Sequence, residues 1–146
     1  MKKYLVIGNP IQHSLSPKLH NFWIKENNIN AIYSKMRINE NDIPQLINQL
    51  KKEEINGINV TIPFKKSVIP FLDEMTPLAK EAQSVNTIFK KENRIIGDNT
   101  DIGGFEKSLE HINYTVKNKK IFILGAGGAT HSIILALKRL GAAKVF

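Results

Sequence analysis

The chain has 146 residues, of which 42% are hydrophobic and 23% charged, and it contains no cysteine. These proportions are typical of a globular protein and exclude long disordered segments, while the lack of cysteine excludes disulfides, thiolate metal sites and a cysteine nucleophile. The opening Met-Lys-Lys and the short apolar run 4–7 do not make a signal peptide, and no run approaches the ~20 residues of a membrane span. We therefore expect a cytoplasmic protein with no membrane partner.

The formal net charge of +8 comes from 21 basic and 13 acidic residues. The lysines occur as scattered pairs with acidic residues between them, and no aromatic residues are interleaved for base stacking. We therefore expect no nucleic-acid partner. A positive field that attracts a small anionic substrate or a nucleotide phosphate explains the charge equally well.

The first predicted elements are a buried strand over 3–7 and a helix that runs to about Asn27. Ser16 is predicted as the N-cap of this helix and Pro17 as its first residue. Trp23 lies on an apolar helical face, which predicts a core position. Capping does not explain Ser14, which fits an anion site beside a helix N-terminus or an ordinary serine-rich turn.

A second strand is predicted over 31–38, followed by a helix that Asn41 or Asp42 caps. This helix carries apolar residues with the spacing i, i+3, i+4 and i+7, namely Ile43, Leu46, Ile47 and Leu50. A third strand follows Gly57. The alternation of strands and helices predicts an α/β fold with a mostly parallel sheet.

The third strand ends in polar side chains that its own packing does not require. Successive strand residues point to opposite faces, so Asn59 and Thr61 are predicted to project together, away from the apolar side chains of Ile58, Val60 and Ile62. Pro63 predicts a helical turn that carries Lys65 and Lys66, where the helix dipole disfavours a cation by roughly 0.3–1 kcal/mol. Either both ammonium groups reach water or one of them has a functional role.

A second polar cluster lies further along the chain, at 97–101. A short helix after Pro77 and a hairpin of strands at 85–89 and 94–97 precede it. Asp98, Thr100 and Asp101 are each candidate caps of the next helix, which carries an apolar stripe that ends at Ile112, and capping explains one of the two acids. Capping does not explain both acids.

From Lys119 the pattern changes to that of a nucleotide-binding fold. Residues 121–124 form a continuous apolar run, and a glycine-rich turn and a helix follow it. This succession is the start of a Rossmann domain, in which glycines let the backbone approach a pyrophosphate at the helix N-terminus. The predicted cofactor-binding residues are Gly125, Ala126, Gly127, Gly128 and Ala129. The residue that distinguishes NAD from NADP is expected about 20 residues beyond the glycines, so the residues themselves leave that choice open.

Taken together, these motifs resemble shikimate dehydrogenase. The matching segments are Gly8-Asn9-Pro10 with Ser14-Leu15-Ser16-Pro17, Asn59 to Lys65, Val85-Asn86-Thr87, Gly97 to Asp101, and Gly125 to Ala129. They occur in the family's order and cover nearly the whole chain. The resemblance implies NADPH-dependent reduction of 3-dehydroshikimate to shikimate, a small-molecule substrate on the route to aromatic amino acids. Quinate/shikimate dehydrogenases share most of these motifs and are the alternative.

The resemblance also implies roles for single residues. Lys65 and Asp101 would form the catalytic pair, in which the lysine donates a proton and stabilises the developing charge on the ketone oxygen. The implied substrate-binding residues are Ser14 and Ser16 for the carboxylate, and Asn59, Thr61, Asn86 and Asp101 for the ring hydroxyls. No metal is implied. His131 and Pro77 depart from common family residues near the cofactor, so their contacts stay open.

The implied domain organisation is a three-layer α/β substrate domain over 1–101, a connecting helix and linker over 102–118, and the beginning of a Rossmann NADP-binding domain over 119–146. The nucleotide domain is expected to be incomplete in these 146 residues, which alone are expected to be inactive. A non-catalytic substrate-binding module is the rival function. A homodimer is one candidate for the oligomeric state.

Overall fold

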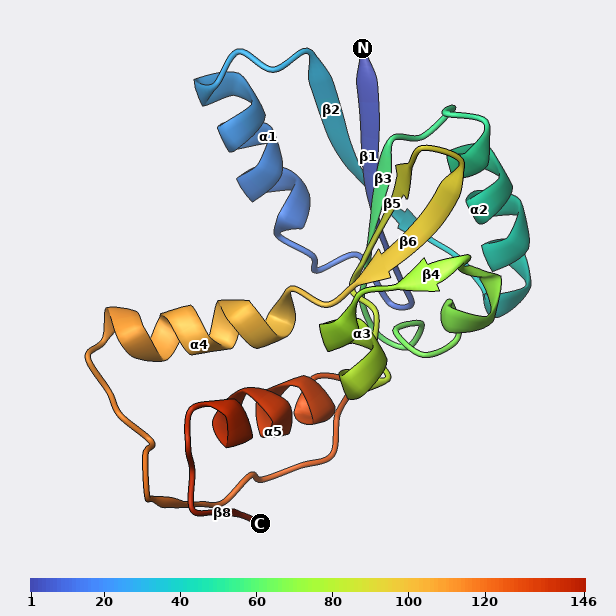
Figure 1. The fold of residues 1–146 in the computed structure, drawn as a ribbon. Helices are drawn as coiled ribbons and strands as arrows, with labels where there is room; N and C mark the ends of the chain where they lie inside the picture. Colours follow the sequence, from blue (N-terminus) through green and yellow to red (C-terminus); the bar gives the residue numbers. More distant parts are fainter.

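The computed structural model describes residues 1–146 (Figure 1). Its main sheet has the strand order β2-β1-β3-β5-β6-β4, and β7 and β8 form a separate two-stranded sheet. The strands are β1 Lys2–Gly8, β2 Ala31–Arg37, β3 Gly57–Val60, β4 Glu74–Met75, β5 Thr87–Lys91, β6 Arg94–Asp98, β7 Lys120–Ile121 and β8 Lys144–Val145. The α-helices are α1 Ser16–Glu26, α2 Ile43–Lys51, α3 Pro77–Ala82, α4 Asp101–His111 and α5 Thr130–Arg139, none of which is long and apolar enough to span a bilayer.

The sheet is mostly parallel, as predicted. β1 pairs in parallel with both β2 and β3, and β4 pairs in parallel with β6. The exception is β5, which runs antiparallel to its neighbours β3 and β6. Consequently β1, β3 and β6 all end at one edge of the sheet, and β5 begins at that same edge.

Helices α1 and α2 lie on opposite faces of the sheet, which gives the expected three layers (Figure 1). The larger core lies on the α2 face, where the four predicted residues of α2 (Ile43, Leu46, Ile47 and Leu50) pack with Ile58 and Val60 of β3. Asn59 is only half-buried and belongs to the other face. The predicted alternation along β3 is therefore confirmed up to Val60.

The prediction for α1 is wrong in two respects. The helix begins at Ser16 itself, with Leu15 at the N-cap position and no side chain that caps it. Its apolar side chains are not in the core, since Phe22 is 57% and Trp23 48% exposed. The helix contacts the sheet through Ile24, which packs against a small cluster that contains Tyr33, and through Asn21, whose side chain accepts a hydrogen bond from Tyr33 N at 2.9 Å and donates one to Tyr33 O at 2.8 Å.

The segment after β3 is also different from the prediction. Pro63 does not start an α-helix: successive turns follow, and then a 3₁₀ helix over Ile69–Phe71. Ile62 lies beyond the strand and is exposed, whereas Phe64 and Val68 turn inward and join the larger core. The helix-dipole argument about Lys65 therefore does not apply.

Helices α3, α4 and α5 pack together through a small second core. It contains Ala82 of α3, Ile102 of α4, and Leu135 and Ala136 of α5. The predicted stripe of α4 is thus only partly right, because Ile112 at its end is exposed. Of the apolar run 121–124, only Ile121 lies in a strand, β7, and Phe122 and Leu124 are exposed.

Candidate active site

The polar motifs of the chain converge at the edge where β1, β3 and β6 end. Ser14 lies in the loop after β1, Ser16 begins α1, and the segment after β3 carries Thr61 and Lys65. Asp101 lies three residues beyond the end of β6. Open α/β sheets bind ligands at the carboxyl ends of their parallel strands, so this edge is the expected place for a site.

Lys65 and Asp101 form an ion pair at this edge. The Lys65 Nζ lies 2.5 Å from Asp101 Oδ2, and the two side chains are 14% and 27% exposed. The backbone of Lys65 is also held, because its carbonyl oxygen accepts a hydrogen bond from Val85 N at 2.9 Å. The pair is partly shielded from water and still accessible, which suits a proton donor and its anchoring carboxylate.

Asn86 connects the ion pair with the start of β5. Its Nδ2 donates to Asp101 Oδ1 at 2.7 Å and to Thr100 Oγ1 at 2.9 Å. Its Oδ1 accepts from Thr100 N at 2.9 Å and from Thr87 Oγ1 at 3.0 Å. Both oxygens of Asp101 are therefore occupied by donors, one from Lys65 and one from Asn86.

The network continues across the sheet to Asn59. Its Nδ2 donates to Thr87 Oγ1 at 3.1 Å and to the carbonyl oxygen of Asn86 at 3.3 Å. Its Oδ1 accepts a hydrogen bond of 2.7 Å from the hydroxyl of Tyr33. Asn59 is thus held from both sides, and the orientation of its amide is set by these partners.

Tyr33 is a member of the site that sequence reasoning missed. Its side chain is 5% exposed, and its ring stacks on that of His20 with a centroid distance of 4.1 Å. Burial raises the pKa of Tyr33 to about 12, against a smaller lowering effect of the Ser16 side chain. Burial likewise lowers the pKa of His20. The sequence signal was the position of Tyr33 in the middle of a predicted strand, which by itself suggests only packing.

Ser14, Ser16 and Thr61 line one hollow of about 320 Å³, together with Pro10 and His13. The Ser14 hydroxyl accepts a hydrogen bond from Ser16 N at 3.3 Å, which leaves its proton free for a ligand. The hollow also depends on a glycine. A Cβ at Gly8 would lie 2.6 Å from Thr61 Cγ2, so only glycine lets the two loops approach this closely.

The glycine-rich turn 125–129 is exposed and leads directly into α5, which begins at Thr130. Gly125 has a φ of +114°, a conformation that glycine adopts without strain. The backbone N–H groups of Gly127, Gly128, Ala129 and His131 donate no hydrogen bond within the chain. Free donors at a helix N-terminus fit a phosphate group, so these residues suit a dinucleotide.

This turn also lies next to the rest of the site. A Cβ placed on Gly128 would lie 3.7 Å from the Ile62 side chain, which belongs to the segment between Thr61 and Lys65. The structure therefore brings all the predicted substrate, catalytic and cofactor residues to one region. No group of three or more His, Cys, Asp or Glu residues is arranged to hold a metal ion.

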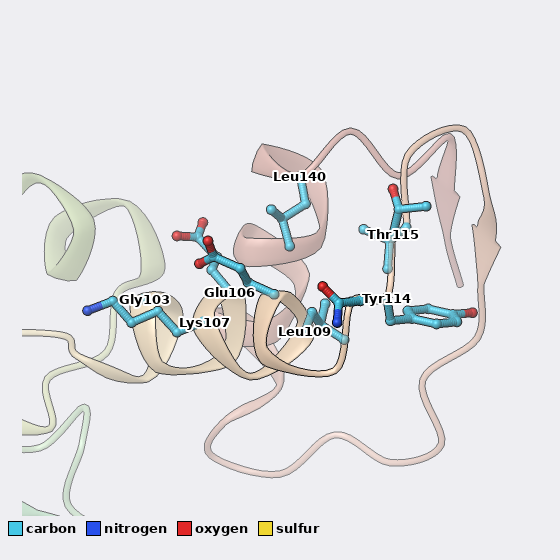
Figure 2. Close-up of a pocket in the computed structure, with 10 residues that line it drawn as sticks. Gly103, Glu106, Lys107, Leu109, Tyr114, Thr115 and Leu140 are labelled. Carbon is cyan, nitrogen blue, oxygen red and sulfur yellow. The ribbon is translucent and has the colours of Figure 1, made fainter.

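A larger hollow than the one beside Ser14 lies elsewhere. It measures about 640 Å³ and lies along α4, the segment 113–116 and the end of α5. Figure 2 shows Leu140, the residue after α5, facing α4, with Glu106 and Leu109 of α4 along the hollow and Tyr114 beyond the end of α4. It contains none of the predicted site residues. Its size alone does not make it the active site, because the polar groups that could act on a substrate are gathered at the sheet edge.

Comparison with known proteins shows the family of the chain. The sequence model described as the shikimate dehydrogenase substrate binding domain matches residues 6–88. This chain belongs to the shikimate dehydrogenase family. The matched range contains the loop with Ser14 and Ser16, the segment with Asn59 to Lys65, and Asn86.

Relatives within the shikimate dehydrogenase family match over almost the whole chain. The NADP(+)-dependent shikimate dehydrogenase of Pelagibacter ubique is 58% identical over 145 residues, which are 99% of this chain and 55% of that protein. The solved shikimate dehydrogenase of Aquifex aeolicus superposes with a TM-score of 0.92 at 41% identity, over 99% of this chain and 55% of that one.

A third shikimate dehydrogenase, from Thermus thermophilus, was solved in complex with NADP(H) and shikimate. It superposes with a TM-score of 0.91 at 31% identity and covers 99% of this chain and 55% of that one. The chain thus spans about half the length of the relatives that it matches. The fold prediction, a substrate domain followed by the start of a Rossmann domain, is confirmed by this agreement.

Proposed function

We propose that the protein reduces 3-dehydroshikimate to shikimate with NADPH, and that Lys65 and Asp101 are its catalytic pair. The observation that carries the proposal is the 2.5 Å contact between Lys65 Nζ and Asp101 Oδ2, at the edge where Ser14, Asn86 and the glycine turn also meet. Relatives in this family are named for NADP(+)-dependent shikimate dehydrogenation, which supports the choice of substrate and cofactor.

In the proposed mechanism, the cofactor supplies a hydride to C3 of the substrate when it is bound. Negative charge then develops on the C3 oxygen. The Lys65 ammonium stabilises this charge and donates a proton from Nζ to the oxygen, which becomes the hydroxyl of shikimate. Asp101 holds the ammonium in place through Oδ2, and Asn86 fixes Asp101 through Oδ1.

The substrate-binding roles follow the geometry of the hollow. Ser14 and Ser16 are proposed to bind the substrate carboxylate through their hydroxyls, and Thr61, which lines the same hollow, is proposed to hold a ring hydroxyl. Asn59 and Asn86 are proposed to hold ring hydroxyls, with Asp101 as a shared acceptor. The glycine turn 125–129 is proposed to bind the phosphates of the dinucleotide through its free N–H groups.

The proposed division into domains places the substrate domain at 1–101, the connecting helix and linker at 102–118, and the nucleotide-binding part from 119 onward. This division is supported by the sheets: β6 is the last strand of the main sheet along the chain, and β7 and β8 form a separate sheet. We further propose a cytoplasmic location and take a homodimer as the candidate assembly. Light scattering on the purified full polypeptide distinguishes a monomer from a dimer.

The test of the proposed function is NADP-linked oxidation of shikimate and of quinate, measured side by side with the full polypeptide. We expect NADPH to form with shikimate as the substrate, and to form at a much lower rate with quinate. A comparable or faster rate with quinate would assign the protein to the quinate/shikimate dehydrogenases. No turnover of either compound would refute the proposed activity.

Replacing Ser14 and Ser16 with alanine is expected to raise the Michaelis constant for shikimate about tenfold or more, with a smaller change in turnover number. The reason is that both hydroxyls would contact the carboxylate, whose interactions are equal in the ground state and the transition state. Steady-state kinetics of both single variants and the double variant measure this effect. An unchanged Michaelis constant would mean that both serines have only a structural role.

A further inference from the structure

A single buried amide, that of Asn99, joins three parts of the chain at the candidate active site. Asn99 lies between β6 and α4 and is 2% exposed. Its Nδ2 donates to Ser84 O at 2.8 Å and to Ser132 Oγ at 2.9 Å. Its Oδ1 accepts from the backbone N–H groups of Asp101 at 3.1 Å and Ile102 at 3.3 Å. Every donor and acceptor position of the amide is therefore used.

Each of these partners belongs to a functional part of the chain. Ser84 precedes Val85, whose N–H holds the backbone carbonyl of Lys65. Asp101 is the first residue of α4, so Asn99 Oδ1 accepts from the first two N–H groups of the helix that presents the carboxylate. Ser132 is completely buried in the first turn of α5, directly after the glycine turn. The Asn99 amide thus connects α5 with both members of the Lys65–Asp101 ion pair.

The packing around Asn99 strengthens this connection. Ile102 of α4 and Ala136 of α5 belong to the same small core, so the two helices are in contact beside the amide. A displacement of the first turn of α5 would break the Ser132 bond or pull on the amide that orients Asp101. Because the amide is buried, water does not replace a lost bond.

We propose that Asn99 is a positioning residue that couples α5 to Asp101, so that a dinucleotide bound at the glycine turn strengthens the binding of substrate. The coupling rests on the proposed function. A phosphate held by the first turn of α5 restrains Ser132, which in turn keeps Asn99 in the orientation that caps α4. By thermodynamic linkage, the substrate strengthens dinucleotide binding by the same factor.

The test measures the dissociation constant of shikimate for the full polypeptide by calorimetry, without and with saturating NADPH. Shikimate and NADPH are both reduced, so this pair binds without reacting. The ratio of the two constants is the coupling factor, and couplings of this kind are on the order of 5- to 150-fold. We expect a factor of about ten in the wild type and about two or less in Ser132→Ala.

Ser132→Ala is the informative variant because it removes one hydroxyl and leaves the cap of α4 in place. The matched control is Ser108→Ala, which removes an exposed serine hydroxyl of α4 that bonds only Phe105 O. The control is expected to keep the wild-type coupling factor. Thermal melting shows that the compared variants are folded.

A double-mutant comparison assigns the coupling to the Asn99–Ser132 bond. In an Asn99→Ala background, Ser132→Ala is expected to have no further effect on the coupling factor. A coupling factor that is unchanged in folded Ser132→Ala, or that equals one in the wild type, would overturn the inference while leaving the proposed activity intact. Absence of shikimate binding to the wild type would instead refute the proposed function, and the inference with it.

Discussion

Replacing Lys65 with alanine is expected to lower the turnover number of the full polypeptide about 100-fold or more, while the affinity for shikimate changes little. The variant loses the group that donates the proton and stabilises charge on the C3 oxygen, both of which matter mainly in the transition state. A 100-fold loss corresponds to about 2.7 kcal/mol of transition-state stabilisation. Steady-state kinetics with NADPH and 3-dehydroshikimate measure the turnover number, and calorimetry measures the affinity.

The chain offers a matched control in the adjacent residue. Lys66 is exposed and makes no ion pair. Lys66→Ala therefore lowers the net charge by the same amount as Lys65→Ala and removes no contact of the site. Its turnover number is expected to stay within about twofold of the wild type, as for most surface substitutions. If Lys65→Ala retained turnover within a few-fold of the wild type, Lys65 would have no role in proton transfer.

A second large effect is expected of Asp101→Asn, which keeps the shape of the side chain and removes its charge. If the amide nitrogen takes the place of Oδ2, two hydrogen-bond donors, this nitrogen and the Lys65 ammonium, point at each other. The partly buried ammonium also loses its counter-ion. We therefore expect a fall in turnover number of about 100-fold, together with a higher Michaelis constant because Asp101 is also proposed to hold a ring hydroxyl.

The control for this variant is Glu110→Gln, which removes one negative charge from an exposed position on the same helix. Kinetics of the two variants at several salt concentrations separate a local effect from one of overall charge, since salt screens exposed charges. Wild-type turnover in a correctly folded Asp101→Asn would refute the proposed pairing. An equal loss in both variants would point to overall charge instead.

Several parts of the fold could be predicted from the sequence because they depend only on the spacing of residues within one element. The four apolar residues of α2 recur at helical spacing, and all four are buried. Ile58 and Val60 alternate with Asn59, so the two faces of β3 were already distinct in the sequence. Such periodicities follow from the geometry of one helix or one strand and need no knowledge of its neighbours.

Errors occurred where a neighbour determines the outcome. The apolar face of α1 predicted burial of Trp23, but the helix contacts the sheet through Asn21 and Ile24 and leaves the Trp23 ring half exposed. The segment after β3 forms turns because Phe64 and Val68 turn into the core. Neither outcome is encoded in the spacing of the segment concerned.

The roles of Tyr33 and Asn99 illustrate the same limit within the site. Tyr33 is one of several aromatic residues in apolar surroundings, and only the sheet places its hydroxyl on Asn59, 26 positions along the chain. Asn99 stands in a recognised polar motif, yet its contact with Ser132 spans 33 positions. Hydrogen bonds at such separations depend on topology, which one-dimensional patterns do not contain.

By itself, the sequence determined which residues carry chemistry and at which loops or strand ends they stand, because residue type and local periodicity are local properties. The tertiary structure decided which of them meet. Lys65 and Asp101 are 36 positions apart, and they are paired because β5 starts at the edge where β3 ends, runs antiparallel to β3, and is followed by β6, which returns the chain to that edge. The same topology brings Asn86 onto the carboxylate and seats α5 against Asn99.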